Sequence, residues 1–365
     1  MGLRRWTIAA AVVATLALVG TSCAPGGIET GDQGSGDITF ALTADRASFE
    51  YAEPVAMTLT ISNFGPESRQ VLSFQLPIDG IDADILDVRR DGVPVPYFGK
   101  VVKRADPLPE DFIDIAAGAS VTFTVDPTEA YDMALPGNYT VRYRAAALST
   151  LSPRQSLLRM ARSDAELREV GSDEVTVSYK GGGQPNEKLN KGSGGAPIPY
   201  YKCSGDQINS LGLAKSNATI ISADARDYFS SASADPVRYT TWFGARTNAR
   251  ADVVYSHFDA INDAFSTQNV IFDCACKKPR YYAYVYPTRP YSIYLCGAFW
   301  TYAGETGTDS RPGTLVHEMS HFNVVASTDD LGYGQAFCVD LATTNPDGAI
   351  TNADSHEYFA EAYWQ

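Results

Sequence analysis

The chain is organised around one heptapeptide near its C-terminal end, Leu315-Val316-His317-Glu318-Met319-Ser320-His321. Its apolar residues, with neither Pro nor Gly among the seven, predict a buried helix. Residues i and i+4 lie on one face of a helix, so His317 and His321 can present two imidazoles to one Zn²⁺ ion. Glu318 would then lie beside the metal, where a carboxylate can take a proton from water. Because the chain has four His among 365 residues, this spacing favours a metal site over a helix with two chance histidines.

Catalytic zinc usually has three protein ligands and one open position, so a third ligand is needed. The metzincin continuation H-x-x-G-x-x-H is absent, because Val324 and Ser327 stand at its Gly and His positions. A Glu from a later helix, as in thermolysin-like enzymes, is one alternative, and Glu357 and Glu361 are the candidates. Closer in the sequence is a turn with two carboxylates, Ser327-Thr328-Asp329-Asp330-Leu331-Gly332-Tyr333-Gly334.

This turn resembles the G-T-x-D-x-x-Y-G motif of the aspzincins, the deuterolysin family of zinc endopeptidases. The resemblance implies that Asp330, nine residues after His321, is the third zinc ligand, and that Tyr333 is the motif Tyr. Ser327 stands where the motif has Gly. That difference concerns the geometry of the turn, since Gly adopts positive φ far more readily than Ser, and it removes no ligand.

Length and charge narrow the class of protein. A chain of 365 residues is long enough for two domains. The net charge of −14 argues against nucleic-acid binding and favours an exported protein.

The N-terminal end predicts export. Residues 1–22 are expected to be a signal peptide, because an arginine pair is followed by an apolar run from Ile8 to Val19 and then by small residues. Cys23 follows directly, which predicts a lipidated bacterial lipoprotein, although Gly20 stands where such sites usually have Leu; ordinary secretion is the alternative. The apolar run is shorter than the about 20 residues of a membrane span, so membrane attachment is expected only through Cys23. Residues 23–37 are expected to be a flexible tether.

Residues 38–180 follow a two-residue period, with turn signals such as Asp91-Gly92 between the runs. This pattern predicts an all-β, immunoglobulin-like sandwich without a Cys pair. Residues 147–170 break the pattern and are expected to form a helical or looped insertion. The segment contains neither His nor Cys, so no catalytic spacing is found in it. The alternating runs are Val55–Ile61, Val121–Val125 and Tyr139–Tyr143.

A Gly-rich linker, residues 181–196, contains Lys188 and Lys191 and precedes the catalytic part, residues 197–365. That part is predicted to be α+β and mostly helical with a small sheet. Helices are expected from near Gln207 to Tyr228, around Ala249–Ile261, at the His-bearing stretch, at Gln335–Ala342 and at Asp354–Ala362. Strands are expected at Val270–Phe272, Tyr282–Tyr286 and Ser292–Leu295.

Five cysteines remain after Cys23. Export favours disulfides, and for Cys274-Ala275-Cys276 two separate bridges are favoured over a metal pair. The resemblance to one aspzincin branch, the peptidyl-Lys metalloendopeptidases, extends through most of residues 200–363. It includes Ala283-Tyr284-Val285-Tyr286-Pro287 and Asn352-Ala353-Asp354-Ser355-His356-Glu357.

The resemblance implies a zincin-type metalloprotease domain, with the β-rich part as its propeptide region. It implies disulfides Cys203–Cys274 and Cys276–Cys296, which would leave Cys338 as an unpaired core thiol. It also implies that Asp354 and Glu357 form an acidic pocket for a substrate lysine. From spacing alone, the same two residues fit an N-cap Asp with its capping-box Glu.

Two further residues are interpreted as structural. Asp309, in Gly307-Thr308-Asp309, is expected to be a turn or helix-entry residue, because it precedes the His-bearing helix. His257 is expected to be an ordinary core or surface histidine on an amphipathic helix.

Together these features predict an exported zinc endopeptidase made as a proenzyme, with one Zn²⁺ held by His317, His321 and Asp330. Glu318 would be the general base, and Tyr333 would stabilise the oxyanion. Substrates would be proteins or peptides cut on the amino side of lysine, and no nucleic acid is expected as a partner. The alternatives are a deuterolysin-like protease of broader specificity and an inactive surface binding protein.

Overall fold

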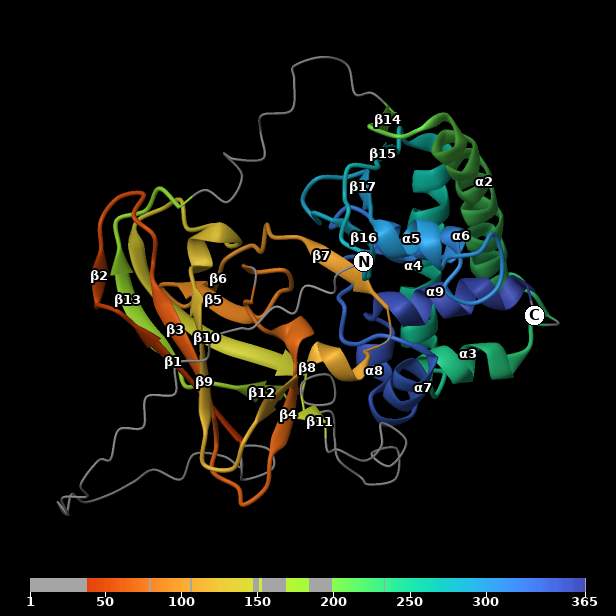
Figure 1. Cartoon of the computed structure of the whole chain (residues 1–365). Helices are drawn as coiled ribbons and strands as arrows, with labels where there is room; N and C mark the ends of the chain where they lie inside the picture. Colours follow the sequence, from red (N-terminus) through yellow and green to blue (C-terminus); the bar gives the residue numbers. More distant parts are fainter. Residues whose placement is uncertain are drawn as a thin grey trace, which may run out of the picture. The chain divides into compact units, whose positions relative to one another are not determined.

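The N-terminal part of the chain is built from β-strands (Figure 1). The computed structural model describes residues 38–78, 80–105, 107–146, 151–152, 169–183, 199–232 and 234–364. In β3 (Met57–Asn63), Met57, Leu59 and Ile61 are buried, while the residues between them are half-buried. β3 pairs antiparallel with β1 (Ile38–Ala44) and β9 (Ser120–Val125).

A second sheet has the order β2-β13-β10-β5-β6, with β12 also paired to β10. Asp91 and Gly92 connect β5 to β6 with φ of 48° and 83°, which suits the predicted tight turn. A third sheet has the order β11-β4-β8. One apolar cluster contains side chains of the first two sheets, among them Ile61 and Val141. The strands of the second and third sheets are β2 (Ser48–Phe49), β4 (Arg69–Leu72), β5 (Leu86–Arg90), β6 (Val93–Pro94), β8 (Phe112–Ile115), β10 (Gly137–Ala146), β11 (Leu151–Ser152), β12 (Glu169–Gly171) and β13 (Val175–Tyr179).

The β-rich N-terminal part is confirmed, while its immunoglobulin-like character and its boundaries remain predictions. Within residues 147–170, the described residues belong to β11 and β12, which pair with β4 and β10. For these residues the expectation of a helix or loop is wrong, because pairing with distant strands determines their structure. The expected signal peptide, Cys23, the tether and residues 184–196 of the linker, with Lys188 and Lys191, lie outside the described residues.

Helices dominate the C-terminal part, as predicted. α2 is closed at its start by a capping box between Ser204 and Gln207, and it packs against α4 and α6. A second apolar cluster is formed by this part, with Leu315, Val316 and Met319 of α6 at 0% exposure. The helices are α2 (Gly205–Asp227), α3 (Pro236–Phe243), α4 (Asn248–Thr267), α5 (Gly297–Thr301), α6 (Arg311–Ser320), α7 (Gln335–Thr344), α8 (Pro346–Ala349) and α9 (Ala353–Glu361).

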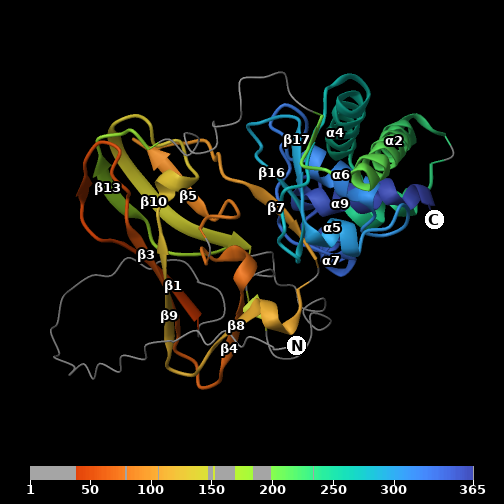
Figure 2. The same cartoon turned by 45° about the horizontal axis from the view of Figure 1, so that its top comes forward.

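The small sheet of the C-terminal part contains one strand from the N-terminal part. Its order is β14 (Tyr200–Tyr201), β15 (Ile271–Asp273), β17 (Ser292–Leu295), β16 (Tyr281–Val285) and β7 (Val101–Arg104). β7 pairs antiparallel with β16, and Figures 1 and 2 both show this orange strand beside the blue-green sheet. All described residues belong to one compact unit, Gln33–Gln365.

The two disulfides implied by the resemblance are present, Cys203–Cys274 and Cys276–Cys296. They connect the loops next to β14, β15 and β17. Cys338 is a buried free thiol on α7, as expected. Among the helices of the described residues, none is long and apolar enough to cross a membrane.

Candidate active site

The His-bearing helix α6 is buried along its whole length after Arg311. Its N-cap is Ser310, whose hydroxyl accepts a hydrogen bond from the Gly313 N–H at 3.0 Å. Pro312 lies in the first turn, where a missing N–H costs nothing. His317 lies on the last turn and His321 is the C-cap residue. The two rings are therefore held at one end of a helix that is packed on all sides.

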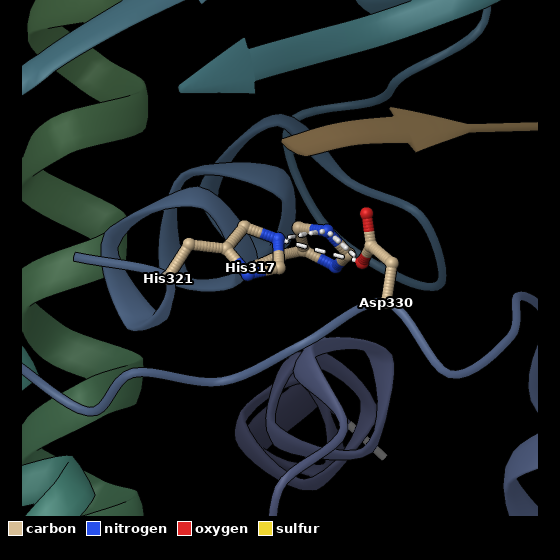
Figure 3. A group of neighbouring side chains, drawn as sticks. All are labelled: His317, His321 and Asp330. Carbon is tan, nitrogen blue, oxygen red and sulfur yellow. Dashed lines mark hydrogen bonds and ion pairs between the residues drawn. The ribbon is translucent and has the colours of Figure 1, made fainter. Parts of the chain in front are cut away.

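Three nitrogen and oxygen atoms converge beside this helix end (Figure 3). The Nε2 atoms of His317 and His321 are 3.1 Å apart. Asp330 Oδ1 lies 3.1 Å from His317 Nε2 and 3.4 Å from His321 Nε2. The structure thus brings together the three predicted ligands, from a helix and the turn after it.

The opposite nitrogens of both rings are held by oxygen atoms. His321 Nδ1 donates a hydrogen bond to the Thr328 carbonyl at 2.7 Å. His317 Nδ1 lies 2.8 Å from Asp354 Oδ1. Because the Thr328 carbonyl takes the proton of Nδ1, the His321 ring presents a lone pair at Nε2, the tautomer that metal binding needs. The carboxylate beside His317 Nδ1 favours the same tautomer by its charge.

The donor set fits a zinc ion. Two imidazole nitrogens and a carboxylate oxygen are ordinary zinc ligands, and three of them leave a position open. Asp330 Oδ1 is buried and makes no hydrogen bond with the described residues, so a metal is the partner that it lacks. Burial acts to raise the pKa of Asp330, but His321 and His317 outweigh it and hold this pKa well below its usual range. The neighbouring Asp329 is exposed and contacts Asn352 through its backbone.

Glu318 is a fully buried carboxylate, with 0% exposure. Neither of its oxygens makes a hydrogen bond with the described residues. Burial raises the pKa of Glu318 to about 7, although His317 and His321 act against this rise. A carboxylate with that pKa can both accept and return a proton near neutral pH.

The hydroxyl of Tyr333 lies next to the three converging donors. It is 3.0 Å from Asp330 Oδ2 and 2.7 Å from the Val102 carbonyl oxygen of β7. Burial, followed by the charge of Asp330, raises the pKa of Tyr333 well above its usual value. The hydroxyl therefore keeps its proton and can donate it to a carbonyl oxygen.

A second acidic group adjoins the first and holds an ammonium group. Lys103 of β7 is fully buried, and its Nζ lies 2.6 Å from Glu357 Oε2 and 3.1 Å from Asp354 Oδ1. Burial alone would lower the pKa of Lys103, but Asp354, Glu357 and Asp309 raise it well above its usual value. Atoms of His317, Asp354 and Glu357 also lie close enough together for a metal. In this structure the Lys103 ammonium pairs with the two carboxylates of this group.

Asp309 belongs to this pocket, which the sequence did not indicate. Its Oδ1 lies 3.3 Å from Lys103 Nζ and accepts a hydrogen bond from the Tyr358 hydroxyl at 3.1 Å. Asp309 directly precedes the N-cap Ser310 and has φ of +50°. The expected turn role is therefore correct but incomplete, because the unusual backbone conformation sends a carboxylate into the pocket.

The capping-box interpretation of Asp354 and Glu357 is wrong. Asn352 is the N-cap residue of α9, and Asp354 lies inside the first turn. The Asp354 side chain instead accepts a hydrogen bond from the Gly334 N–H at 2.8 Å. Glu361, the other candidate third ligand, accepts hydrogen bonds from the N–H and hydroxyl of Ser310 at 2.8 and 2.7 Å.

The remaining sequence expectations concern Ser327 and His257. Ser327 has φ of +50°, so this turn keeps a left-handed residue without the motif Gly. His257, on α4, contacts His356 on α9, with Nδ1 and Nε2 3.0 Å apart. It lies outside the group of converging ligands, as expected.

Comparison with known proteins now assigns the class. Residues 228–361 match the aspzincin family model described as a lysine-specific metallo-endopeptidase. An extracellular protease of Aeromonas hydrophila is 39% identical over 316 residues, which are 85% of this chain and 88% of that protein. A peptidyl-Lys metalloendopeptidase of Armillaria mellea is 37% identical over 274 residues, 74% of each chain. A solved zinc peptidase from Grifola frondosa is 46% identical and covers 44% of this chain and 98% of its own, with a TM-score of 0.42.

The family model and the two sequence relatives, together with the buried H-E-x-x-H helix, define a metallopeptidase. The chain belongs to the aspzincin family and is a zinc metalloendopeptidase.

Proposed function

We propose that this protein is an exported endopeptidase that cuts peptide bonds on the amino side of lysine and is made as a proenzyme. The observation that supports the specificity is the acidic pocket of the buried Asp354 and Glu357 and the partly exposed Asp309, which holds an ammonium group beside the proposed metal ligands. The similarity to a protease named extracellular supports export.

His317, His321 and Asp330 would hold the zinc ion. When bound, Zn²⁺ supplies a Lewis acid that lowers the pKa of water and polarises a carbonyl group. Glu318 takes the proton from the attacking water and later delivers it to the leaving amine. The Tyr333 hydroxyl donates a hydrogen bond to the oxygen of the scissile carbonyl as negative charge develops there.

The pocket is expected to prefer lysine over arginine. Three carboxylates contact the ammonium. Asp354 and Glu357 lie at positions i and i+3 on the first turns of α9, and Asp309 is the third. An ammonium is a compact charge with three donors, whereas a guanidinium needs a planar, fork-shaped receptor. Tyr282 and Tyr358 also place their rings 5.5 and 5.9 Å from the Lys103 nitrogen, which adds attraction for a cation.

The test is a digest of a denatured protein mixture, analysed by mass spectrometry, with the zinc content of the enzyme measured in parallel. Lysine is expected directly after nearly every cut bond. A broad set of residues there would favour the deuterolysin-like alternative. Absence of cleavage by a chain that contains zinc would favour the inactive binding protein.

The proenzyme part of the proposal concerns the linker. Lys188 and Lys191 stand in a Gly-rich segment, where an enzyme with this specificity could cut Glu187–Lys188 or Asn190–Lys191 and release the β-rich part. N-terminal sequencing of the active form tests this, with Lys188→Gln/Lys191→Gln and Glu318→Gln proteins expected to stay full length. A non-lysine terminus that still forms in the Glu318→Gln protein would assign the cut to another protease.

Three finer interpretations belong to the same proposal. The β-rich part is immunoglobulin-like, the catalytic part is of the zincin type, and Cys23 is the attachment point of a lipid. Mass measurement of the exported protein tests the last of these, since a lipidated Cys23 at the mature N-terminus has a characteristic added mass.

A further inference from the structure

Glu361, on the last turn of α9, is a buried carboxylate that the proposed reaction does not use. It is 1% exposed. It follows Asp354 by seven residues and Glu357 by four, so the three carboxylates lie along one face of the helix. Burial of a carboxylate is costly unless polar groups pair with it. The partners of Glu361 therefore indicate what this side chain contributes.

The hydrogen bonds of Glu361 go to the two residues that precede α6. Its Oε2 accepts one from the Asp309 N–H at 3.2 Å. Its Oε1 accepts two from Ser310, from the N–H at 2.8 Å and from the hydroxyl at 2.7 Å. Since Ser310 is the N-cap residue of α6, Glu361 fixes both the entry to the His-bearing helix and the backbone of Asp309.

The first turn of α6 leaves room for this carboxylate. Gly313 lies within that helix, where Gly is less favourable than Ala. A Cβ atom added at Gly313 would overlap with Glu361 Oε1. The absence of a side chain at this position is therefore what lets the Glu361 carboxylate reach Asp309 and Ser310.

Asp309 needs such support because neither its backbone nor its packing fixes it. Its φ of +50° is unfavourable for a residue other than Gly. Its side chain is 34% exposed, so packing alone does not hold the carboxylate. Nevertheless, Asp309 Oδ1 lies 3.3 Å from the Lys103 ammonium and accepts a hydrogen bond from the Tyr358 hydroxyl.

We propose that Glu361 is a positioning residue for substrate specificity. It holds the backbone of Asp309 so that the Asp309 carboxylate points into the lysine pocket. Glu361 thus acts through Asp309 and not by contact with the substrate. This inference rests on the proposed preference for lysine.

The experiment is a double-mutant cycle with Glu361→Gln, Asp309→Asn and the double variant. Gln keeps the length of the side chain but has one acceptor oxygen, which can serve Ser310 and cannot also serve the Asp309 N–H. Each full-length chain is expressed, and the active form that it yields is assayed on two peptides, with lysine or norleucine after the cut bond. The readouts are the lysine-to-norleucine ratio of kcat/KM and the zinc content.

Each single variant is expected to lower this ratio about three- to tenfold, as for loss of a partly exposed contact with a charged group. The double variant should fall no further than Asp309→Asn alone, because the two residues act as one unit. The zinc content and kcat/KM for the norleucine peptide should stay at the wild-type level.

A second variant disturbs the same contact and keeps the charge of Glu361. Gly313→Ala should displace the Glu361 carboxylate and lower the ratio as Glu361→Gln does. Gly212→Ala is the matched control, since Gly212 lies in α2 and a Cβ atom added there meets no atom within 4 Å. It should leave the ratio unchanged.

Additive losses in the double variant would overturn the proposal, because Glu361 would then act on the pocket by its charge and not through Asp309. Loss of zinc, or equal losses for both peptides, would also overturn it and assign Glu361 to the stability of α6. The same holds if the wild-type enzyme prefers lysine and either Glu361→Gln or Asp309→Asn leaves the ratio unchanged. If the wild-type enzyme itself does not prefer lysine, the proposed function fails.

Discussion

Glu357→Gln is the substitution that isolates the lysine pocket most cleanly. The two side chains have nearly the same shape, so the change removes one negative charge and leaves the volume of the buried site. Glu357 Oε2 lies 2.6 Å from the bound ammonium, and both side chains are 0% exposed. A hydrogen bond to a charged group contributes about 1.5–3 kcal/mol. With about 1.4 kcal/mol per factor of ten, kcat/KM for a lysine substrate should fall about 10- to 100-fold.

The assay uses processed enzyme and three peptides that differ after the cut bond, with lysine, arginine or norleucine there. Glu357→Gln should lower kcat/KM for the lysine peptide and leave the norleucine peptide unchanged or better. For the norleucine peptide kcat/KM can rise, because its uncharged side chain then lies beside one buried carboxylate fewer. Asp347→Asn is the control, since Asp347 is an exposed carboxylate paired with Arg250 on the surface.

A different pattern would refute this reasoning. Glu357 Oε2 is also 3.4 Å from His317 Nδ1, so the substitution could act through the metal ligand instead. In that case kcat/KM would fall by the same factor for all three peptides, and the zinc content of the enzyme would fall as well. An equal loss for lysine and norleucine means that the carboxylate does not recognise the substrate side chain.

Three further predictions test the rest of the site. Glu318→Gln should keep zinc and lose at least about 100-fold in kcat, the usual contribution of a general base; an active variant contradicts the assignment. Metal analysis should find that Asp330→Ala loses zinc and that Asp329→Ala keeps it. The reverse result would make Asp329 the ligand in place of Asp330. Burial lowers the pKa of His257 to about 4 and that of His356 to about 3. Below their ordinary value of about 6.5, the unfolded chain therefore binds protons that the folded chain does not. The free energy of unfolding should fall as pH drops from about 6.5 toward 4, and His257→Gln should reduce this slope in urea titrations.

The sequence predicted the parts of the site that local spacing determines. His317 and His321 are one helical turn apart, so their meeting needs no knowledge of distant contacts. Asp330, in the turn after the helix, was chosen over Glu357 and Glu361 only through the resemblance to the aspzincin motif. The strand at Ser292–Leu295 and the helix from near Gln207 were predictable for the same reason, since periodicity and capping residues are local signals.

The lysine pocket could be predicted only through resemblance, and its third carboxylate was missed. Asp309 has a φ of +50°, and although Asp adopts this conformation more often than most residues, the sequence does not show which way its carboxylate then points. β7 was equally unpredictable as part of the catalytic sheet. Its partner strand β16 lies far along the chain, and a two-residue period shows that a strand forms without showing where it pairs.

In the proposed function, Asp354 would couple substrate recognition to metal binding. Its Oδ1 lies 2.8 Å from His317 Nδ1 and 3.1 Å from Lys103 Nζ, and its Oδ2 accepts from the Gly334 N–H. One carboxylate thus contacts a metal ligand, the bound lysine and the turn that carries Tyr333. The negative charge that attracts a lysine also makes the His317 imidazole a better donor to zinc. Replacing Asp354 must therefore change both functions at once, whereas Glu357, which is closer to the ammonium than to the ring, reports mainly on lysine.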